Sequence, residues 1–410
     1  MNCQTLLSAV LVPFLVSGIV VAPAHAQGDV GDATARTFHR IVSAAQAGPG
    51  NGALDDDRDF DGDRDFGDRG RAIPGENPLS IRRVYGLPPF GGHGTIAIVG
   101  AFHWPTALND FNRFARTWGL PRERSNDAGA ASNRVFQVVY ADGTQPAVDA
   151  GWALESAIDV EWAHAMAPDA RIVLVEATSS AFHDLFHAVD VASALPGVTE
   201  VSMSWGASEF ATEGTFEHHF TQTPGIIYFG ATGDAGGTTQ YPSTSPNVVA
   251  VGGTRLNRDS RGRFLSETGW ADSGGGSSAF LAIPAYQASQ PTVAAQVGTQ
   301  RGVPDVSFDA DQASGVAVYD STPDNGLSGW LVVSGTSVGT PATAGVVNLS
   351  HTWNRRHPAG SAAELTLMYQ GLGNRDRFRD ILSGTAGSFS CHAGWDFVTG
   401  IGAAVGVAGK

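Results

Sequence analysis

The chain has 410 residues and a formal net charge of −15, and Lys410 is its only lysine. This length accommodates one large domain or two, and the apolar and glycine content is that of a globular α/β protein with long loops. Because an acidic surface repels other polyanions, the charge argues against nucleic acid and anionic membranes as partners.

An apolar run opens the chain over residues 4–26 and ends in Ala24-His25-Ala26, although the first four residues carry no cation. This pattern predicts a signal peptide over residues 1–26 and hence a secreted protein, extracellular or, in a Gram-negative source, periplasmic. An N-terminal membrane anchor is the alternative. No other run is long and apolar enough to span a bilayer, so we expect no stable membrane association after signal removal. Removal also takes away Cys3 and leaves Cys391 without a disulfide partner.

Residues 27–77 form a polar stretch with a short helical pattern near residues 37–47. Residues 51–72 consist mainly of Asp, Arg and Gly, and this composition cannot bury enough apolar surface to fold. We therefore predict a short, acidic, largely disordered pro-segment or linker over residues 27–77. The composition fits a regulatory segment and a tail without a role equally well.

From about Pro78 onward, short apolar runs alternate with helical patterns. This alternation predicts an α/β fold with a mostly parallel sheet flanked by helices, in which reactive groups lie at the carboxyl ends of strands. The predicted strands are 95–100, 134–140, 171–176, 200–205, 225–230, 247–254, 263–270, 303–308, 315–319 and 330–333, and the predicted helices are 105–118, 152–167, 182–195, 342–351 and 362–371.

Ser337 lies between the last of these strands and a helix that we expect to contain Pro341 in its first turn. At the positive end of a helix a serine hydroxyl is well placed to act as a nucleophile. A helix N-cap is the alternative.

Three carboxylates are candidate partners of this serine. Glu155 and Asp159 are four residues apart in a predicted helix and so share one face, and Asp234 follows a predicted strand. A solvated acidic stripe and an Asx-turn are the respective alternatives. No histidine occurs between His103 and His164, and the first predicted strand ends without an Asp, which argues against a Ser-His-Asp triad.

Several motifs in register resemble the sedolisins, the serine-carboxyl peptidases with a subtilisin-like fold. The similarity spans roughly residues 78–408. The motifs are Ser334-Gly335-Thr336-Ser337 with Pro341, Glu155 with Asp159, Gly233-Asp234-Ala235-Gly236, Tyr241-Pro242-Ser243-Thr244-Ser245-Pro246 running into Val251-Gly252-Gly253-Thr254, and Arg301-Gly302-Val303-Pro304-Asp305.

The resemblance implies a catalytic role for each of these residues. Ser337 would attack the scissile carbonyl, Glu155 would act as general base, Asp159 would hold Glu155, and protonated Asp234 would donate to the oxyanion. A glutamate accepts a proton at pH values where histidine is already protonated, so the set implies an endopeptidase that works in acid on polypeptide substrates. Substrate would pair with the strand edge at Ser204, Trp205 and Gly206.

The resemblance also implies one structural Ca²⁺ in a loop near the C-terminus. Carboxylates of Asp380 and Asp396 and carbonyl groups of Ile381, His392 and Gly394 would be its ligands. His392 stands where the family usually has Gly. A polar loop closed by turn Asp residues is the alternative.

Sedolisins usually carry a large folded prodomain, whereas here only residues 27–77 lie between the predicted signal and the peptidase domain, residues 78–410. Either maturation needs no folded prodomain, or this tail blocks the cleft directly. We expect a monomeric, secreted acid endopeptidase with a single catalytic domain. A non-catalytic peptide-binding protein on the same scaffold is the alternative.

Overall fold

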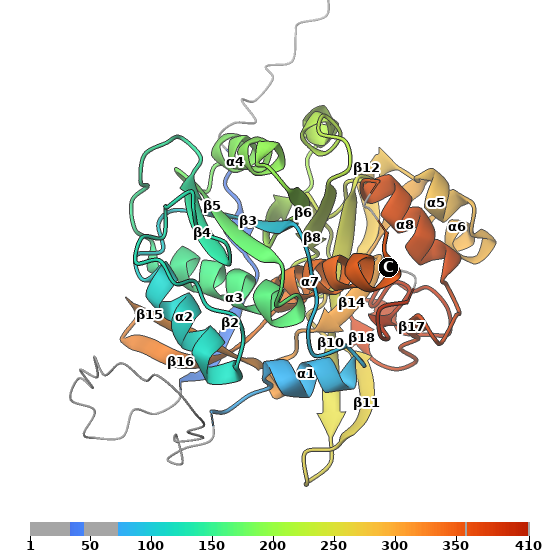
Figure 1. Ribbon diagram of the computed structural model, residues 1–410. Helices are drawn as coiled ribbons and strands as arrows, with labels where there is room; N and C mark the ends of the chain where they lie inside the picture. Colours follow the sequence, from blue (N-terminus) through green and yellow to red (C-terminus); the bar gives the residue numbers. More distant parts are fainter. Residues whose placement is uncertain (1–32, 45–72, 357–358, 409–410) are drawn as a thin grey trace, which may run out of the picture. The chain divides into compact units, whose positions relative to one another are not determined.

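A computed structural model describes residues 33–44, 73–356 and 359–408, all of which belong to one structural unit (Figure 1). The predicted signal peptide and the Asp-rich stretch 51–72 lie outside the described residues. In the described part of the chain, no helix is long and apolar enough to cross a membrane.

A ten-stranded, mostly parallel sheet forms the centre of the structure, as predicted. Seven of its neighbouring pairs are parallel, whereas β11 and β17 join antiparallel. In spatial order the strands are β17 (Phe378–Arg379), β20 (Ala403–Ala404), β14 (Val306–Asp309), β10 (Val248–Arg258), β8 (Ile227–Ala231), β6 (Val198–Met203), β3 (Thr95–Ala101), β5 (Arg171–Ala177) and β4 (Phe136–Tyr140), with β11 (Phe264–Gly269) on β10.

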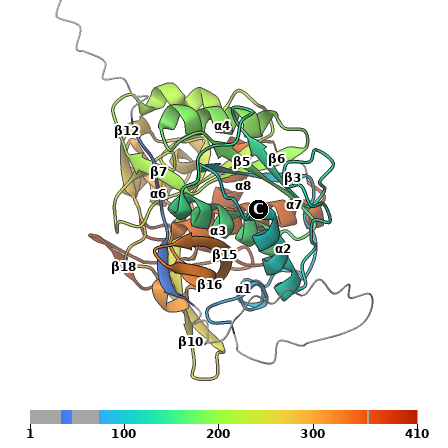
Figure 2. The same cartoon turned by 90° about the vertical axis from the view of Figure 1, so that its left-hand side faces the viewer.

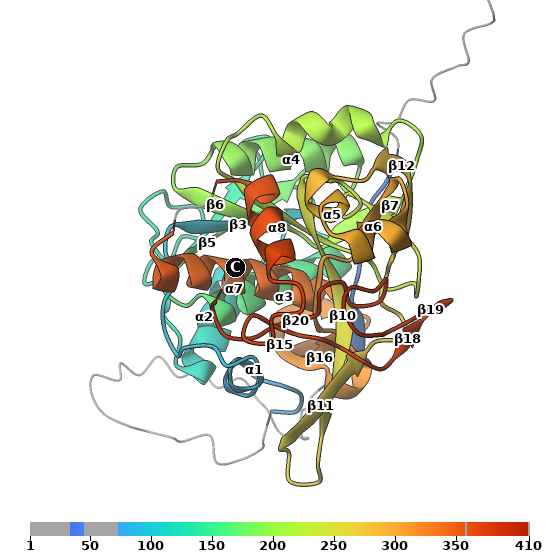
Figure 3. The same ribbon diagram turned by 90° about the vertical axis from the view of Figure 1, so that its right-hand side faces the viewer.

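Helices cover both faces of this sheet (Figures 1 and 3). Side chains alternate along a strand, so in β3 Ile96 and Ile98 pack into one hydrophobic core while Ala97 and Val99 pack into the other. The described α-helices are α1 (Pro78–Val84), α2 (Ala107–Trp118), α3 (Ala150–Met166), α4 (Phe182–Ala194), α5 (Ala285–Ala288), α6 (Pro291–Val297), α7 (Thr336–Asn354) and α8 (Ser361–Gln370). Helices α3 and α7 belong to the first core, and α4 belongs to the second.

Smaller sheets border the central one. They contain β1 (Arg36–Thr37), β7 (Trp205–Ser208) and β9 (Gln240–Tyr241); β15 (Val316–Asp324), β16 (Leu327–Ser334) and β2 (Arg40–Ala44); β12 (Gly276–Ala282) and β13 (Gln300–Val303); and β18 (Thr385–Ala386) and β19 (Phe389–Ser390). Two 3₁₀ helices, Glu213–Phe220 and Gln312–Ser314, lie in connecting segments.

Two local predictions are wrong. The helical pattern near residues 37–47 does not form a helix in its described part, residues 37–44, because residues 40–44 are a strand that pairs with β16. The second concerns Pro341, which lies inside α7 in its second turn and not in its first, since this helix begins at Thr336.

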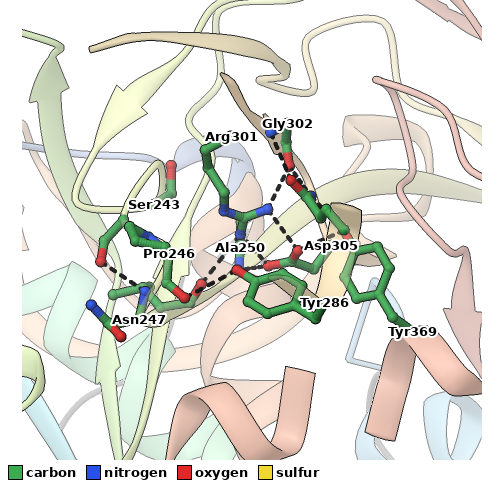
Figure 4. Close-up of polar contacts among 12 residues, drawn as sticks. Ser243, Pro246, Asn247, Ala250, Tyr286, Arg301, Gly302, Asp305 and Tyr369 are labelled. Atoms are coloured by element: carbon green, nitrogen blue, oxygen red, sulfur yellow. Dashed lines mark hydrogen bonds and ion pairs between the residues drawn. The ribbon is translucent and has the colours of Figure 1, made fainter. Parts of the chain in front are cut away.

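A buried ion pair ties the end of β13 to the central sheet (Figure 4). The guanidinium of Arg301 donates to both carboxylate oxygens of Asp305, at 2.8 and 2.5 Å, and both side chains are fully buried. Asp305 also accepts from the Tyr369 hydroxyl of α8 at 2.9 Å and from the Ala250 N–H of β10 at 2.8 Å. Every oxygen of the carboxylate is therefore hydrogen-bonded, which a buried charge requires.

Candidate active site

Helix α3 carries Glu155 and Asp159 into the interior. The Asp149 side chain caps the helix by accepting from the Trp152 N–H at 3.0 Å. Helix α3 is buried almost all round, so the two carboxylates, one turn apart, are each only 1% exposed. The alternative of a solvated acidic stripe is thereby excluded.

Burial and the neighbouring charge of Glu155 raise the pKa of Asp159 well above its usual value. The Ser204 hydroxyl donates to Asp159 Oδ1 at 2.6 Å, which opposes this shift. Asp159 therefore holds its proton to a higher pH than an ordinary aspartate does.

Ser337 follows the tight connection between β16 and α7. Gly335 adopts a φ of 129°, in the region that favours glycine, and an added Cβ atom would come within 2.6 Å of Asp234 Oδ2. Ser337 is the second residue of α7, so its N–H makes no hydrogen bond within the helix. Its hydroxyl donates to the Ser204 carbonyl at 3.4 Å.

The position of Pro341 affects the backbone carbonyl of Ser337. Without an N–H, Pro341 cannot donate to the carbonyl of Ser337, four residues earlier. The Ser204 hydroxyl lies 3.4 Å from this carbonyl oxygen and so adjoins both Ser337 and Asp159. Ser204 thereby links the nucleophile helix to the acidic helix.

Asp234 follows β8 and turns toward the start of α7. Its Oδ1 accepts from the Thr336 N–H at 2.9 Å and from the Thr336 hydroxyl at 2.8 Å, whereas its Oδ2 is buried and has no partner among the described residues. Burial is the largest cause that raises the pKa of Asp234, to about 7, with Glu155 adding to it and Thr336 opposing it. The free oxygen thus carries a proton in acid.

An extended segment, residues 33–44, passes between these groups. Strand β1 pairs antiparallel with β7, and β2 pairs antiparallel with β16. Figure 2 shows this segment in blue beside β16. The first 12 described residues of the predicted disordered tail are therefore ordered, because strands far away in the sequence hold them.

Three consecutive residues of this segment contact the three candidate groups. The Phe38 N–H donates to Ser337 Oγ at 3.1 Å, and the Phe38 carbonyl accepts from the Ser337 N–H at 3.1 Å. His39 Nδ1 bonds Glu155 Oε2. Arg40 donates to the Asp234 carbonyl at 2.9 Å. The tail therefore lies directly on Ser337, Glu155 and Asp234.

The His39 contact explains why Glu155 is not hydrogen-bonded to Ser337. Burial alone would lower the pKa of His39, but the charge of Glu155 and the hydrogen bond to it outweigh burial and raise it. The imidazole therefore keeps its proton to a higher pH than a free histidine does, and it bonds Glu155 Oε2, while Glu155 Oε1 has no partner among the described residues.

Two of the three residues predicted to bind substrate, Trp205 and Gly206, belong to β7. Trp205 and Gly206 pair with Thr37 and Arg36, so this edge does receive an extended peptide, which belongs to the chain itself. Trp205 is fully buried and donates through its indole N–H to the Val99 carbonyl at 2.9 Å. The third predicted residue, Ser204, donates a hydrogen bond from its hydroxyl to Asp159.

The predicted calcium loop brings its two carboxylates to one short segment. Asp380 Oδ2 accepts from the Gly394 N–H at 3.0 Å, and Asp396 Oδ2 accepts from the His392 N–H at 3.1 Å. Asp380 Oδ1 is buried and has no described partner, which suits a cation. No group of three or more His, Cys, Asp or Glu side chains in the described residues could hold a metal ion, so carbonyl groups such as that of Ile381 would have to supply further ligands.

Sequence reasoning missed Phe38, His39 and Arg40 as site residues. The nearest signal was the apolar pair Ile41-Val42 beside Phe38, which is typical of a strand. Its partners lie almost 300 residues away in β16, beyond the reach of a local pattern.

The sequence and the structure have relatives among known proteins. The Peptidase_S8 profile of the subtilase family matches residues 148–402. Kumamolisin from Bacillus sp. (strain MN-32) is 30% identical over 294 residues, 62% of this chain and 49% of kumamolisin. Sedolisin from Pseudomonas sp. (strain 101) is 25% identical over 369 residues, 80% of this chain and 59% of sedolisin. The chain therefore matches only 49% to 59% of the length of these relatives.

A solved structure has the same fold. "Pseudomonas sedolisin (serine-carboxyl proteinase) complexed with two molecules of pseudo-iodotyrostatin" matches with a TM-score of 0.66 at 23% identity, over 82% of this chain and 96% of that one. The fold and the family profile define a subtilisin-like α/β protein, and the chain belongs to the subtilase family. Within this family, its sequence is similar to those of sedolisin and kumamolisin.

Proposed function

We propose that this chain is a serine-carboxyl endopeptidase that hydrolyses peptide bonds at acidic pH. The observation that carries the proposal is the placement of a peptide carbonyl, that of Phe38, at the Ser337 N–H, 3.1 Å away. Asp234 Oδ2, which carries a proton in acid, has no partner in the described part of the chain and adjoins the same connection at Gly335. Two donors are thus available for an oxyanion.

The mechanism follows from these positions. Ser337 Oγ attacks the carbonyl carbon, and Glu155 takes the hydroxyl proton once no imidazole occupies it. Asp159, which keeps its own proton, lies on the same face of α3 as Glu155 and positions it there. Asp159 also accepts a hydrogen bond from the Ser204 hydroxyl. The Ser337 N–H and the proton on Asp234 Oδ2 stabilise the oxyanion. Glu155 then returns the proton to the leaving amine.

The remaining expectations belong to this proposal. The protein would be secreted as a monomer, would act on polypeptides that pair with β7, and would bind no nucleic acid and form no stable membrane association. One Ca²⁺ would be held by Asp380 and Asp396 with carbonyl groups of Ile381, His392 and Gly394, and would fix this loop. Cys391, the one cysteine in the described residues, is buried and forms no disulfide, so no disulfide of Cys391 fixes this loop.

A pH–rate profile on denatured protein substrate tests the proposal. We expect activity in acid that Ser337→Ala lowers by roughly 10⁴-fold or more. Glu155→Gln should lower it strongly as well, whereas Asp376→Asn, at an exposed position, should not. A maximum at alkaline pH would contradict the Glu155 base, and binding without cleavage at any pH would indicate a peptide-binding protein instead.

A further inference from the structure

A groove lined by arginines lies between α1 and the hairpin of β10 and β11, outside the residues of the candidate active site. The hairpin extends beyond the central sheet beside α1 (Figures 1 and 3). The groove has a volume of about 560 Å³, and four of its lining residues are Arg83, Arg258, Arg261 and Arg263. We call it the arginine groove.

Two of these arginines are paired within the protein. Arg258 binds both carboxylate oxygens of Glu76, with Nη2 2.6 Å from Oε2, and it donates to the Gly262 carbonyl at 3.1 Å. Arg263 donates through Nε to Asp259 at 2.7 Å. The Arg258–Glu76 pair joins the hairpin to the segment that precedes α1, so it holds the two walls of the groove together.

Arg83 and Arg261 supply positive charge that is not compensated. Both side chains are exposed, and neither guanidinium has a hydrogen bond or an ion pair with another described residue. This local excess of cations occurs in a chain whose formal net charge is −15. A guanidinium presents a planar fork of N–H donors that fits a carboxylate or a phosphate. The groove therefore favours a ligand that carries several anionic oxygens.

The groove also offers apolar surface between its charges. Val84 and Phe264 line it, and the guanidinium carbon of Arg379 lies 4.6 Å from the centroid of the Phe264 ring. Leu265, the next residue of β11, is 63% exposed. An acidic peptide with aromatic side chains between its carboxylates matches such a surface better than a small inorganic anion does, because it also buries apolar area.

The chain carries a peptide of this kind shortly before the groove in sequence. Residues 55–68 comprise eight Asp, two Arg, two Phe and two Gly, with a net charge of −6. The described chain resumes at Ile73, two residues before Gly75, which lines the groove. A short tether of this kind gives an effective concentration on the order of millimolar, so that even weak contacts are occupied.

We propose that the arginine groove is a binding site for Asp-rich peptide and that its occupant is residues 55–68 of the same chain. Carboxylates of this segment pair with Arg83 and Arg261, and its phenylalanines pack against Val84 and Phe264. The site goes beyond the proposed peptidase function and does not depend on it. It attaches the N-terminal part of the chain to the enzyme at a place separate from the pairing of β1 and β2.

The test measures peptide binding to the full chain carrying Ser337→Ala, so that the probe is not digested. The probe is a fluorescently labelled synthetic peptide of residues 55–68, followed by anisotropy at low salt, where exposed charges are least screened. We expect it to bind a chain in which the eight Asp of residues 55–68 are replaced by Asn. It should bind the parent chain roughly tenfold more weakly, because the tethered segment competes for the groove.

Arginine variants of the Asn-substituted chain locate the bound peptide. Arg83→Ala combined with Arg261→Ala should weaken binding by roughly tenfold, since two ion pairs are lost. Arg116→Ala, at an exposed position of α2 outside the groove, should leave the affinity unchanged.

Three results would contradict the inference. Equal binding to the parent and the Asn-substituted chain would show that residues 55–68 do not occupy the groove. An unchanged affinity in the Arg83 and Arg261 variant would place the peptide elsewhere. Displacement of the peptide by millimolar inorganic phosphate would show a site for small anions instead of a peptide site.

Discussion

The two carboxyl oxygens of Asp234 differ in their hydrogen bonding. Oδ1 accepts twice from Thr336, and Oδ2 has no partner among the described residues. Because a carboxylic acid donates from one oxygen only, the hydrogen bonds on Oδ1 direct the proton to Oδ2. The pKa of about 7 means that this proton is held below neutrality and lost above it.

The pH dependence of turnover should therefore follow Asp234. Asp234→Ala removes the donor and should lower kcat by about 10²- to 10³-fold. Asp234→Asn keeps an N–H donor at every pH, so the residual activity should no longer fall as pH rises through about 7. Profiles of kcat measured between pH 3 and 9 check this. An Asn variant that keeps the alkaline decline would assign that decline to another group.

His39 occupies one oxygen of the proposed general base. Its imidazole bonds Glu155 Oε2, so only Glu155 Oε1 remains to accept the Ser337 proton while the contact lasts. We expect His39→Ala to raise the rate at which the full chain hydrolyses denatured protein several-fold, measured in acid. His183→Ala, at an exposed histidine, is the matched control. Slower hydrolysis by His39→Ala would mean that the imidazole supports the reaction instead.

At the scale of the elements, the α/β alternation of sequence patterns predicts the central sheet correctly. Strands such as Thr95–Ala101 and helices such as α3 form where their apolar patterns indicate. Segment 33–44 could not be predicted in this way, because its strands depend on backbone pairing with β7 and β16. Ser337, Glu155, Asp159 and Asp234 carry recognisable motifs, but how the tail engages three of them depends on tertiary structure alone.

Two Arg–Asp pairs with the same four-residue spacing allow one element to be tested. Arg301 and Asp305 are fully buried, whereas Arg263 of the Arg263–Asp259 pair is 72% exposed. Asp305→Asn leaves the guanidinium buried without its counter-charge, so the free energy of unfolding should fall by about 3–5 kcal/mol. Asp259→Asn should have a much smaller effect, because solvent screens that pair. Urea unfolding of Ser337→Ala variants, which cannot digest themselves, measures both. Equal effects would show that the buried pair adds no special stability.

At the scale of the whole molecule, no disulfide within the described residues ties down the C-terminal region. Its short strands β18, β19 and β20 and the loop from Asp380 to Asp396 hold together through hydrogen bonds and packing. A cation that binds the folded state alone would stabilise it by mass action, by roughly 3 kcal/mol at a hundredfold excess over Kd.

Chelation should therefore lower the Tm of the Ser337→Ala protein by several degrees, and added Ca²⁺ should restore it. The Asp380→Ala variant should have a lower Tm and no longer respond to chelator, whereas Asp376→Asn should respond as the parent does. Differential scanning calorimetry checks both. If the parent and Asp380→Ala respond equally, calcium does not bind at this loop.

The segment on the active site also provides a starting point for ligand design. Arg36 and Thr37 pair with β7, and the Phe38 side chain is buried beside Gly206 and Gly233. A short peptide of this sequence that ends in an aldehyde would let Ser337 add reversibly to the carbonyl carbon, and the resulting tetrahedral adduct would use the Ser337 N–H and Asp234 as an oxyanion does. Residues 36–38 thus provide a template for an inhibitor directed at Ser337.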